Sequence, residues 1–507
     1  MRYGVVIDNR KCIGCHSCTV ACKTENRVPL GVNRTWVKYV EKGRYPHTRR
    51  FFQVTRCNHC DKPPCVEICP VSAMHRRNDG VVDFNPATCI GCKACMQACP
   101  YDAIYVDPER NTAAKCHLCG HRLEVGLEPA CASVCPQHAI VAGDLDDADS
   151  DVAQLLARAA VRVRKPEQGT RPRVFYIDAD ESTLVPTVAR HEPFYMWSER
   201  NRQVEGGGAA YAPNSPFPQR DTLAAYDVAH ERPWGWQVPF YFWMKSIGSG
   251  VLAVPALAKA LGRLSADPLR DIILSSIALV FMAATVVMLV FDLSRKQRFM
   301  NVLLSPQRRS WVSKGAFLLV IYCALGGAFL LSGLTGLGRF SHALLWPTVL
   351  AGFLAAVYTA FLFGQCEGRD LWQTPLLPLH LLVQAFLASA SVLLLMPATR
   401  DQLGLYNLAV GSLRICLLLH LLMVLGEIAI PHNTDNARYA VWLITRGSYG
   451  HLFWAGAVAL GGVLPLLLLF ARAANAAIAG LSGLLALGGL LAFEWCFVMA
   501  GQRVPNS

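Results

Sequence analysis

The second half of the chain alternates long apolar runs with short polar loops, beginning near residue 237. A helix needs about 20 apolar residues to cross the hydrocarbon core of a bilayer. Eight runs are long enough, and this number in so short a stretch argues against buried helices of a soluble protein. We predict spans at 238–261, 271–291, 313–335, 344–365, 378–397, 407–430, 448–471 and 477–499.

The first half shows shorter alternations. The stretches "GVVDFNPATC" and "NTAAKC" predict short strands and turns that lead into cysteine-rich loops. After two of these loops, "AIYVDPE" and "AIVAGDL" predict the second strands of ferredoxin-like hairpins. We therefore expect an α+β double ferredoxin-like domain over 1–190, a linker over 191–236 and an all-α eight-helix transmembrane bundle over 237–507.

The region between the two halves is mixed. "VAQLLARAAVRVRK" predicts a surface helix, "RPRVFYI" predicts a strand, and the Gly and Pro residues of "EGGGAAYAPNSPFPQ" predict a loop. The simplest interpretation is a strap that joins the two halves, and a contact surface for a partner is the alternative.

Cysteine is concentrated in the first half, and sixteen of the 20 cysteines lie between Cys12 and Cys135. They form four groups, each of which starts C-x2-C and ends C-x3-C, with only the central gap varying. The groups are Cys12, Cys15, Cys18 and Cys22; Cys57, Cys60, Cys65 and Cys69; Cys89, Cys92, Cys95 and Cys99; and Cys116, Cys119, Cys131 and Cys135.

This spacing indicates iron–sulfur clusters. A C-x2-C-x2-C loop directs three thiolates to one cluster, and the trailing cysteine, often followed by proline, reaches the neighbouring cluster. Sixteen thiolates at four per cluster predict four [4Fe–4S] clusters. Zinc is the main alternative, but its cysteines come as separated pairs. Disulfides suit small secreted scaffolds, and the N-terminus "MRYGVVIDNRKC" contains no apolar signal segment.

With "RTWVKYVEKG", "RCNHCDKPPC" and "CIGCKACMQACPYDAIY", the four groups resemble the four-cluster subunits of membrane-bound molybdopterin oxidoreductases over about 1–190. The resemblance implies that groups one and four share two clusters, and that groups two and three share the other two. The implied sets are Cys12, Cys15, Cys18 and Cys135; Cys116, Cys119, Cys131 and Cys22; Cys57, Cys60, Cys65 and Cys99; and Cys89, Cys92, Cys95 and Cys69. Lys23 follows Cys22 where the family pattern has proline.

The second half, from about 226, resembles quinone-interacting anchors of the NrfD and polysulfide-reductase type. The resemblance rests on "HERPWGWQVPFYFWMKSIGSG", a basic loop after the second run and the closing "FVMAGQRVP". These two halves are usually separate chains, so the sequence is similar to a natural fusion of an electron-transfer subunit and its anchor.

Charge supports a membrane setting. Residues 1–235 carry 30 Lys+Arg and 27 Asp+Glu, and residues 236–507 carry 18 and 9. Counting basic residues in the loops predicts the cysteine domain on the cytoplasmic side of the inner membrane, with the periplasmic side as the alternative. The basic residues form no stripe with interleaved aromatic residues, so we expect no nucleic-acid partner.

A quinone pocket needs an apolar slot, donors for the carbonyl oxygens and a proton source. We expect it at the boundary between the cysteine domain and the bundle, where an aromatic and basic interfacial belt is the competing interpretation. The candidates are His230, Trp236, Asp292, Arg295, Tyr358 and Arg369, with Trp234 beside them. Within the runs, His420, Glu427 and Glu494 are candidates for proton transfer or for interhelical hydrogen bonds.

The sequence contains no pterin-binding domain, nucleotide fingerprint or nucleophile with a base, so we expect no catalytic residue beyond quinone chemistry. The resemblance implies a catalytic partner with a molybdenum or tungsten bis-pterin, joined through the clusters to menaquinone or ubiquinone in the lipid bilayer. The alternative is a module of an energy-converting, proton-translocating quinone-linked complex that docks a cytochrome.

Overall fold

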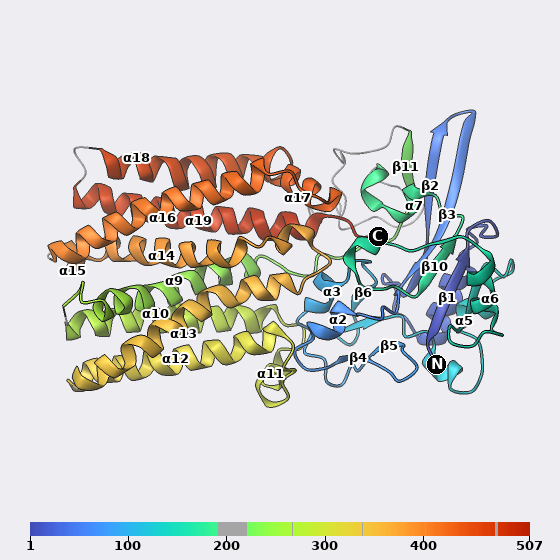
Figure 1. Cartoon of the computed structure of the whole chain (residues 1–507), viewed down its shortest axis with the longest axis horizontal. Helices are drawn as coiled ribbons and strands as arrows, with labels where there is room; N and C mark the ends of the chain where they lie inside the picture. Colours follow the sequence, from blue (N-terminus) through green and yellow to red (C-terminus); the bar gives the residue numbers. More distant parts are fainter. Residues whose placement is uncertain (191–220, 266, 337, 401, 472–474) are drawn as a thin grey trace.

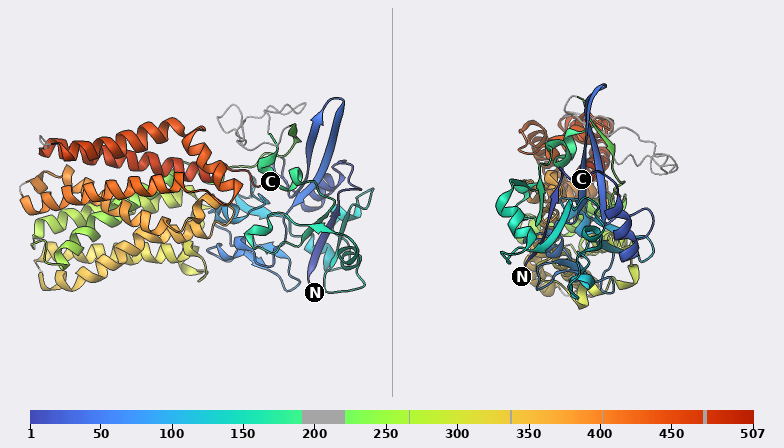
Figure 2. Two further views of the ribbon diagram at one scale, coloured as in Figure 1. Left: turned by 45° about the horizontal axis from the view of Figure 1, so that its top comes forward. Right: turned by 90° about the vertical axis from the view of Figure 1, so that its right-hand side faces the viewer.

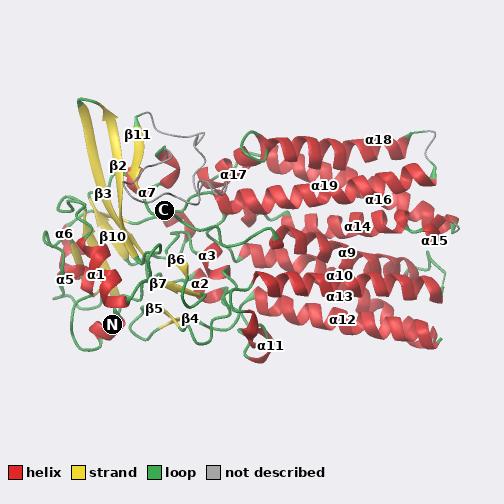
Figure 3. Ribbon diagram, turned by 180° about the vertical axis from the view of Figure 1, so that it is seen from behind, coloured by secondary structure: helices red, strands yellow, loops and turns green. Residues whose placement is uncertain are grey.

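A computed structural model describes residues 1–190, 221–265, 267–336, 338–400, 402–471 and 475–507. The chain forms an elongated molecule in which a bundle of long helices occupies one end and the cysteine-rich domain the other (Figure 1). Seen from behind, the described strands lie in the cysteine domain, and the long helices run side by side away from it (Figure 3).

The cysteine domain contains two small sheets and two hairpins. The first sheet has the order β8-β1-β10-β9 and the second has the order β11-β2-β3, while β4 pairs with β5 and β6 pairs with β7. The strands are β1 (Tyr3–Asp8), β2 (Thr35–Arg44), β3 (His47–Arg56), β4 (Met74–Arg76), β5 (Val82–Phe84), β6 (Ile104–Asp107), β7 (Thr112–Lys115), β8 (Ile140–Asp144), β9 (Val161–Arg162), β10 (Val174–Ile177) and β11 (Thr222–Tyr226).

Short helices follow or contain the cysteine groups. They are α1 (Ser17–Asn26), α2 (Pro64–Glu67), α3 (Ala94–Ala98), α4 (Gly120–Leu123) and α5 (Ala130–Ser133). Helix α6 (Asp151–Arg158) is capped by the Ser150 hydroxyl, which accepts from the Ala153 amide. The remaining short elements are α7 (Glu181–Leu184), η1 (Pro166–Gln168) and η2 (Pro186–Val188).

The region between the halves contributes more to the cysteine domain than a strap would. The predicted helix and strand of this region are present as α6 and β10. Strand β10 pairs in parallel with β1, and β11, which falls within the predicted linker, pairs antiparallel with β2. The predicted Gly- and Pro-rich loop lies outside the described residues.

Each predicted apolar run coincides with a long helix of the bundle. The helices are α9 (Gln237–Ala260), α10 (Pro268–Asp292), α12 (Trp311–Thr335), α13 (Gly338–Gly364), α14 (Leu377–Leu395), α16 (Leu403–Ala429), the π-helix η5 (Leu452–Val463) continued by α18 (Leu464–Phe470), and α19 (Ala476–Arg503). Short segments connect them: η3 (Lys296–Arg298), α11 (Asn301–Leu304), η4 (Asp370–Gln373), α15 (Pro397–Arg400) and the amphipathic α17 (Asp435–Thr445).

Seven helical segments of the described chain are long and apolar enough to cross a membrane. Helix α9 is not among the seven. It packs against α10, α13, α14 and α19, and most of its residues are buried. Its composition is consistent with this central place, because Lys245 and the small residues of "SIGSG" stand where a lipid-facing helix would carry leucines.

One hydrophobic core runs through both halves of the molecule. It includes Cys57 and Cys95 of the cysteine domain together with Trp234, Phe363 and Trp372 of the bundle. Viewed along the long axis, the cysteine domain lies over the end of the bundle (Figure 2). The two halves are therefore packed as one folded unit.

Candidate functional site

Two cysteine loops repeat the same backbone conformation. In the loop after Cys12, Gly14 has a φ of 72° and His16 a φ of 59°, and in the loop after Cys89, Gly91 has 71° and Lys93 has 59°. Left-handed residues between cysteines turn successive amides to one side, which forms a nest suited to an anion. The two loops that share the C-x2-C-x2-C spacing thus also share a backbone conformation.

Cysteines distant in sequence surround two cavities in the domain. Cys12, Cys15, Cys18 and Cys135 line one cavity together with Val37, Val54 and Ile140. Cys69, Cys89, Cys92 and Cys95 line another, beside Met74 and Phe84. We call these groups the first set and the fourth set. Both contain three cysteines of one loop and the trailing cysteine of a different loop.

The other eight cysteines form two further groups of close sulfurs. Cys22 lies within electrostatic range of Cys116, Cys119 and Cys131, which form the second set with it. Cys60 and Cys65 each lie within electrostatic range of Cys57 and Cys99. These four cysteines form the third set.

The four sets lie next to one another in two pairs. Cys18 of the first set lies near Cys131 of the second, and Cys65 of the third lies near Cys95 of the fourth. Cys15 at the outer end is exposed to solvent. At the inner end, Cys92 lies where the domain meets the bundle.

Hydrogen-bond donors point at several of these sulfurs. The buried Arg56 donates from its two terminal nitrogens to Cys116 Sγ and Cys131 Sγ, both at 3.2 Å. Burial alone would lower the pKa of the Arg56 guanidinium, but the two adjacent sulfurs raise it well above its usual value. Backbone amides of Gly91 and Ala139 lie 3.4 Å and 3.3 Å from the sulfurs of Cys89 and Cys135.

These features fit iron–sulfur clusters. A cluster is a large body whose four thiolates stand apart at its corners, and it is stabilised by N–H···S bonds and an apolar surround. The first and fourth sets, which enclose cavities, match that description.

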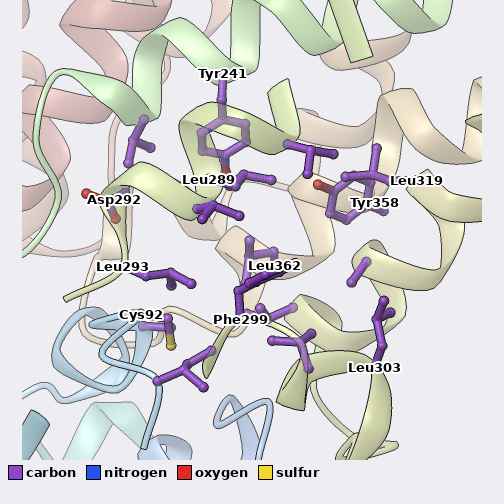
Figure 4. A pocket seen from close by; sticks show the side chains of 18 of the residues that line it. Cys92, Tyr241, Leu289, Asp292, Leu293, Phe299, Leu303, Leu319, Tyr358 and Leu362 are labelled. Atoms are coloured by element: carbon purple, nitrogen blue, oxygen red, sulfur yellow. The ribbon is translucent and has the colours of Figure 1, made fainter. Parts of the chain in front are cut away.

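Next to the fourth set lies an apolar pocket of about 350 Å³, within the size range of small-molecule sites. Its walls come from α9, α10, α12 and α13, and Cys92 closes the end nearest the cysteine domain. Figure 4 shows Tyr241, Asp292 and Tyr358 around this space, with the Cys92 sulfur beside the loop of the cysteine domain.

Few polar groups reach the pocket. Asp292 accepts a hydrogen bond of 3.1 Å from Lys93 Nζ, so that a carboxylate of the bundle is joined to the residue next to Cys92. Trp234 also lines the pocket, and its indole donates to the Cys92 carbonyl oxygen at 3.2 Å. Two tyrosines, Tyr241 and Tyr358, provide phenol groups.

Of the predicted pocket residues, the structure brings Asp292 and Tyr358 to this cavity, together with Trp234. The other four lie outside it. His230 contacts Ser507 Oγ at 2.7 Å, and Trp236 is half exposed against Phe240.

The two predicted arginines serve the junction between the halves. Arg295 donates to the Arg110 carbonyl oxygen at 2.7 Å. Arg369 is buried, and it donates to Gln97 Oε1 and to the Val504 carbonyl oxygen, both at 2.8 Å.

Sequence reasoning missed Tyr241, Lys93 and Arg56. Tyr241 lies in the aromatic stretch "PFYFW", and the sequence pattern does not show which of these rings faces a pocket. Lys93 is one of the two residues between Cys92 and Cys95, and the C-x2-C spacing says nothing about their side chains. Arg56 stands directly before Cys57, but Lys11 and Lys115 stand in the same place before Cys12 and Cys116, and Lys11 is exposed, so position alone did not single out Arg56.

Comparison with known proteins agrees with this geometry. A family model described as "Polysulphide reductase, NrfD" matches residues 226–506, more than half of the chain. The chain belongs to the NrfD family. Two models described as "4Fe-4S dicluster domain" match residues 11–74 and 48–145 of this NrfD-family chain. It is therefore a fused protein with iron–sulfur domains before a multi-pass membrane anchor.

Curated relatives match a little over a third of the NrfD-family chain. A tetrathionate reductase subunit of Salmonella typhimurium is 45% identical over 202 residues, which cover 39% of this chain and 80% of the relative. A polysulfide reductase chain of Wolinella succinogenes is 39% identical over 181 residues, covering 35% and 94%. The arsenate respiratory reductase iron-sulfur subunit ArrB of Shewanella sp. (strain ANA-3) is 39% identical over 225 residues, covering 35% and 96%.

Proposed function

We propose that this chain carries electrons between a catalytic partner subunit and membrane quinone through four [4Fe–4S] clusters. The observation that carries the proposal is Cys92, which belongs to the fourth cysteine set and also lines the apolar pocket. A redox centre at this position would lie next to any molecule in the pocket.

The four sets are the proposed cluster ligands. The first to fourth sets would hold one cluster each, in the pairing that the sequence resemblance implies. When bound, such clusters accept and donate single electrons, and their potentials follow the charge, hydrogen bonding and exposure around them. Arg56 would supply charge and hydrogen bonds to the second set. The backbone amides of Ala139 and Gly91 would supply hydrogen bonds to the first and fourth sets.

The fold supports the finer architecture. We infer a double ferredoxin-like arrangement from the paired use of loops one with four and two with three. We also infer that α9 is an eighth span, because it runs alongside the seven apolar helices (Figure 1) and packs against four of them, α10, α13, α14 and α19. Helices buried inside a membrane bundle need less apolar surface than those that face lipid.

The pocket suits the ring of menaquinone or ubiquinone. Val286 of α10 and Val320 of α12 line the pocket and are 39% and 52% exposed, so its mouth faces the bilayer. In the interior, the phenols of Tyr241 and Tyr358 would donate to quinone carbonyl oxygens. Asp292, held by Lys93, would accept a proton at its carboxylate when a quinol is oxidised.

The partner would dock at the outer end, where Cys15 is exposed. The relatives are subunits of tetrathionate, polysulfide and arsenate reductases. By the family resemblance we propose a partner with a molybdenum or tungsten bis-pterin that acts on a sulfur or arsenic oxyanion. We place the complex in the inner membrane with the cysteine domain in the cytoplasm, and the periplasmic side is the alternative.

Quinol oxidation by the purified, cluster-containing chain tests the proposal. Tyr358→Phe and Asp292→Asn should each slow cluster reduction by menaquinol by about tenfold or more, since each removes a polar contact to a reacting oxygen. The cluster spectra in electron paramagnetic resonance should stay unchanged. Tyr406→Phe, a tyrosine on α16 away from the pocket, is the control. Equal rates in all four proteins would refute the pocket assignment.

A further inference from the structure

The connection between α10 and α12 carries an excess of positive charge. Residues 293–366 contain no Asp or Glu, yet six basic residues lie between positions 295 and 314. Arg295 and Arg298 donate to carbonyl oxygens of the cysteine domain, so their charges are used to join the two halves of the molecule.

Other cations of this connection are directed away from the protein. Lys296, Arg308 and Lys314 are exposed. None of the three forms an ion pair or a side-chain hydrogen bond with another described residue. Their charge is therefore available to a partner outside the chain.

Two of these cations border the seam along which α12 and α13 pack (Figure 1). Lys314 Nζ lies 4.4 Å from the ring centre of Trp311, and the Trp311 ring stacks on Phe361 of α13 with 4.5 Å between centres. The side chain of Gln365, one helical turn after Phe361, donates to the carbonyl oxygen of residue 309 at 3.0 Å. Lys314 and the neighbouring Arg308 therefore lie at the same end of the seam.

The backbone at this end of the seam is fixed by the cysteine domain. The Ser310 hydroxyl caps α12 by accepting from the Val312 amide, and it donates to the Ile68 carbonyl oxygen at 2.6 Å. Ser313 Oγ donates to the Pro70 carbonyl oxygen at 2.9 Å. A cation held on a fixed backbone loses less entropy when it binds, and the positive end of the α12 dipole adds to its attraction for an anion.

Exposed apolar side chains continue along the seam from the cations. Phe317 and Ile321 follow Lys314 by three and seven positions, so they share its face of α12, and both are exposed. Leu354 and Phe361, also exposed, are seven positions apart on α13. Seven residues rise about 10 Å along a helix. Both rows lead away from the cysteine domain, because α12 begins and α13 ends beside it.

An interfacial belt of separate basic and aromatic residues is the simpler explanation. In such a belt each cation acts alone. Here Lys314, Trp311 and Phe361 are stacked in one order beside two apolar rows. A soluble anion such as phosphate would use the cations but not the rows. A phospholipid would use both, with its phosphate at the cations and its acyl chains along the rows.

We propose that Arg308 and Lys314 bind the phosphodiester of one anionic phospholipid of the phosphatidylglycerol class, whose acyl chains lie along the α12–α13 seam. A zwitterionic headgroup carries its own cation, which these two side chains repel. The bound lipid holds the start of α12 against the second cysteine group and so stabilises the junction of the two halves.

This site is separate from the apolar pocket. Val312 and Ala316 line the pocket and stand two positions before and after Lys314. At 100° per residue they lie on the opposite face of α12. The proposed lipid site therefore does not depend on the proposed electron transfer.

Thermal unfolding of the full chain with its clusters, in a neutral detergent, tests the site. The unfolding temperature is measured with increasing phosphatidylglycerol, with phosphatidylcholine of the same acyl chains, and with inorganic phosphate. A ligand that binds only the folded chain raises this temperature according to its affinity. Phosphatidylglycerol should raise it to a plateau, whereas phosphatidylcholine and inorganic phosphate should leave it unchanged.

Lys314→Gln and Arg308→Gln should each weaken the apparent affinity for phosphatidylglycerol by about fivefold, as expected for the loss of one basic residue at a lipid headgroup. Phe317→Ala should weaken it by a similar factor through lost contact with an acyl chain. Lys296→Gln, which removes the same charge at the α10 end of the connection, is the control and should bind as the wild type does. Each variant is compared with its own unfolding temperature without lipid, and its cluster spectra show that it has assembled.

The other outcomes would overturn the site. Equal losses of affinity in Lys296→Gln and Lys314→Gln would show a diffuse attraction to a charged surface. Equal stabilisation by phosphatidylcholine would remove the role of charge, and equal stabilisation by inorganic phosphate would remove the lipid as the occupant. An affinity that survives Lys314→Gln, Arg308→Gln and Phe317→Ala would place the lipid elsewhere on the bundle.

Discussion

At the scale of single residues, Arg56 illustrates how this chain prepares a cluster environment. A buried guanidinium needs compensating negative charge, and here two sulfurs of the second set supply it at 3.2 Å. The Arg56 charge in turn affects the cluster, because a fixed positive charge stabilises the more negative, reduced form of a cluster.

Arg56→Gln should therefore lower the midpoint potential of one cluster. Loss of the charge and of one donor should shift it by roughly 50 mV, about 1 kcal/mol for one electron and typical of a hydrogen bond to a charged group. A redox titration followed by electron paramagnetic resonance measures this shift. Arg56→Lys keeps the charge and should give a smaller change, and identical potentials in the three proteins would contradict the assignment.

Glu367, at the junction of the halves, predicts a pH effect. Burial, followed by repulsion from Glu67, raises the pKa of the Glu367 carboxyl to about 7. The folded protein then binds a proton more tightly than the unfolded chain, so this group stabilises the fold at low pH. That stability is lost as the pH rises from about 4.5 to about 7.

Glu367→Gln should remove the loss of stability at high pH, because glutamine does not ionise. We expect it to raise unfolding stability at pH 8 by about 1 kcal/mol, an amount discounted for the partial exposure of the carboxyl, with little effect at pH 4.5. Thermal unfolding in detergent at the two pH values measures the difference. A variant stabilised equally at both values would show that the carboxyl is not the cause.

At the scale of elements, the long helices were predictable because apolar length alone determines them. Helix α9 was predicted too, although its burial inside the bundle was not visible in its sequence. The pocket was only partly predicted. Its lining comes from the Cys92 loop, Trp234, four long helices and the connecting segment 293–303 with α11, and a single sequence does not show which turns of different helices meet. The pairing of the cysteines was predicted from ligand spacing and the family resemblance alone, without knowing which helices meet.

The π-helix η5 shows how closely two elements approach. Gly461 on η5 faces Gly489 on α19, and a Cβ added to Gly489 would lie 2.1 Å from Gly461 Cα. Neighbouring Gly488 has no atom within 4 Å of an added Cβ. Small residues at such contacts let membrane helices pack backbone against backbone.

Alanine substitutions at these two glycines should change the stability of the bundle in opposite directions. Gly489→Ala should destabilise the bundle by about 1–3 kcal/mol through overpacking, while Gly488→Ala should stabilise it by up to about 1 kcal/mol through helix propensity. Thermal unfolding in detergent compares them directly. A loss of stability at position 488 as large as that at 489 would argue against the close contact.

At the scale of the whole molecule, basic residues counted as loop charges have a different role. Arg298 donates to the carbonyl oxygens of Pro86 and Cys89 at 2.8 and 3.0 Å, and Arg295 is held in the same way. On the opposite face, Lys259 is paired with Asp271 at 2.6 Å. Charge counting treats every basic residue as free, whereas these three side chains are held by protein partners.

Arg369 should matter most for the junction of the halves. It binds Gln97 and the Val504 carbonyl oxygen, with Asp102 3.6 Å away. Arg369→Ala leaves these buried acceptors unpaired and should cost about 3 kcal/mol, and it should slow quinol-to-ferricyanide transfer because the Cys92 loop loses its support.

Arg309→Ala, at an exposed arginine on the same side of the bundle, is the control for Arg369→Ala. It should alter neither stability nor rate. If both variants behave like the unsubstituted chain, the contacts of Arg369 do not hold the junction together.

The cysteines are not equally sheltered along the molecule. Cys15 at the outer end is open to solvent, whereas Cys65 and Cys95, deep in the shared core, are closed off. Oxygen and peroxide attack metal–sulfur bonds that they can reach. Damage in air should accordingly begin at the first set, which contains Cys15, so that the chain loses its outermost cluster first.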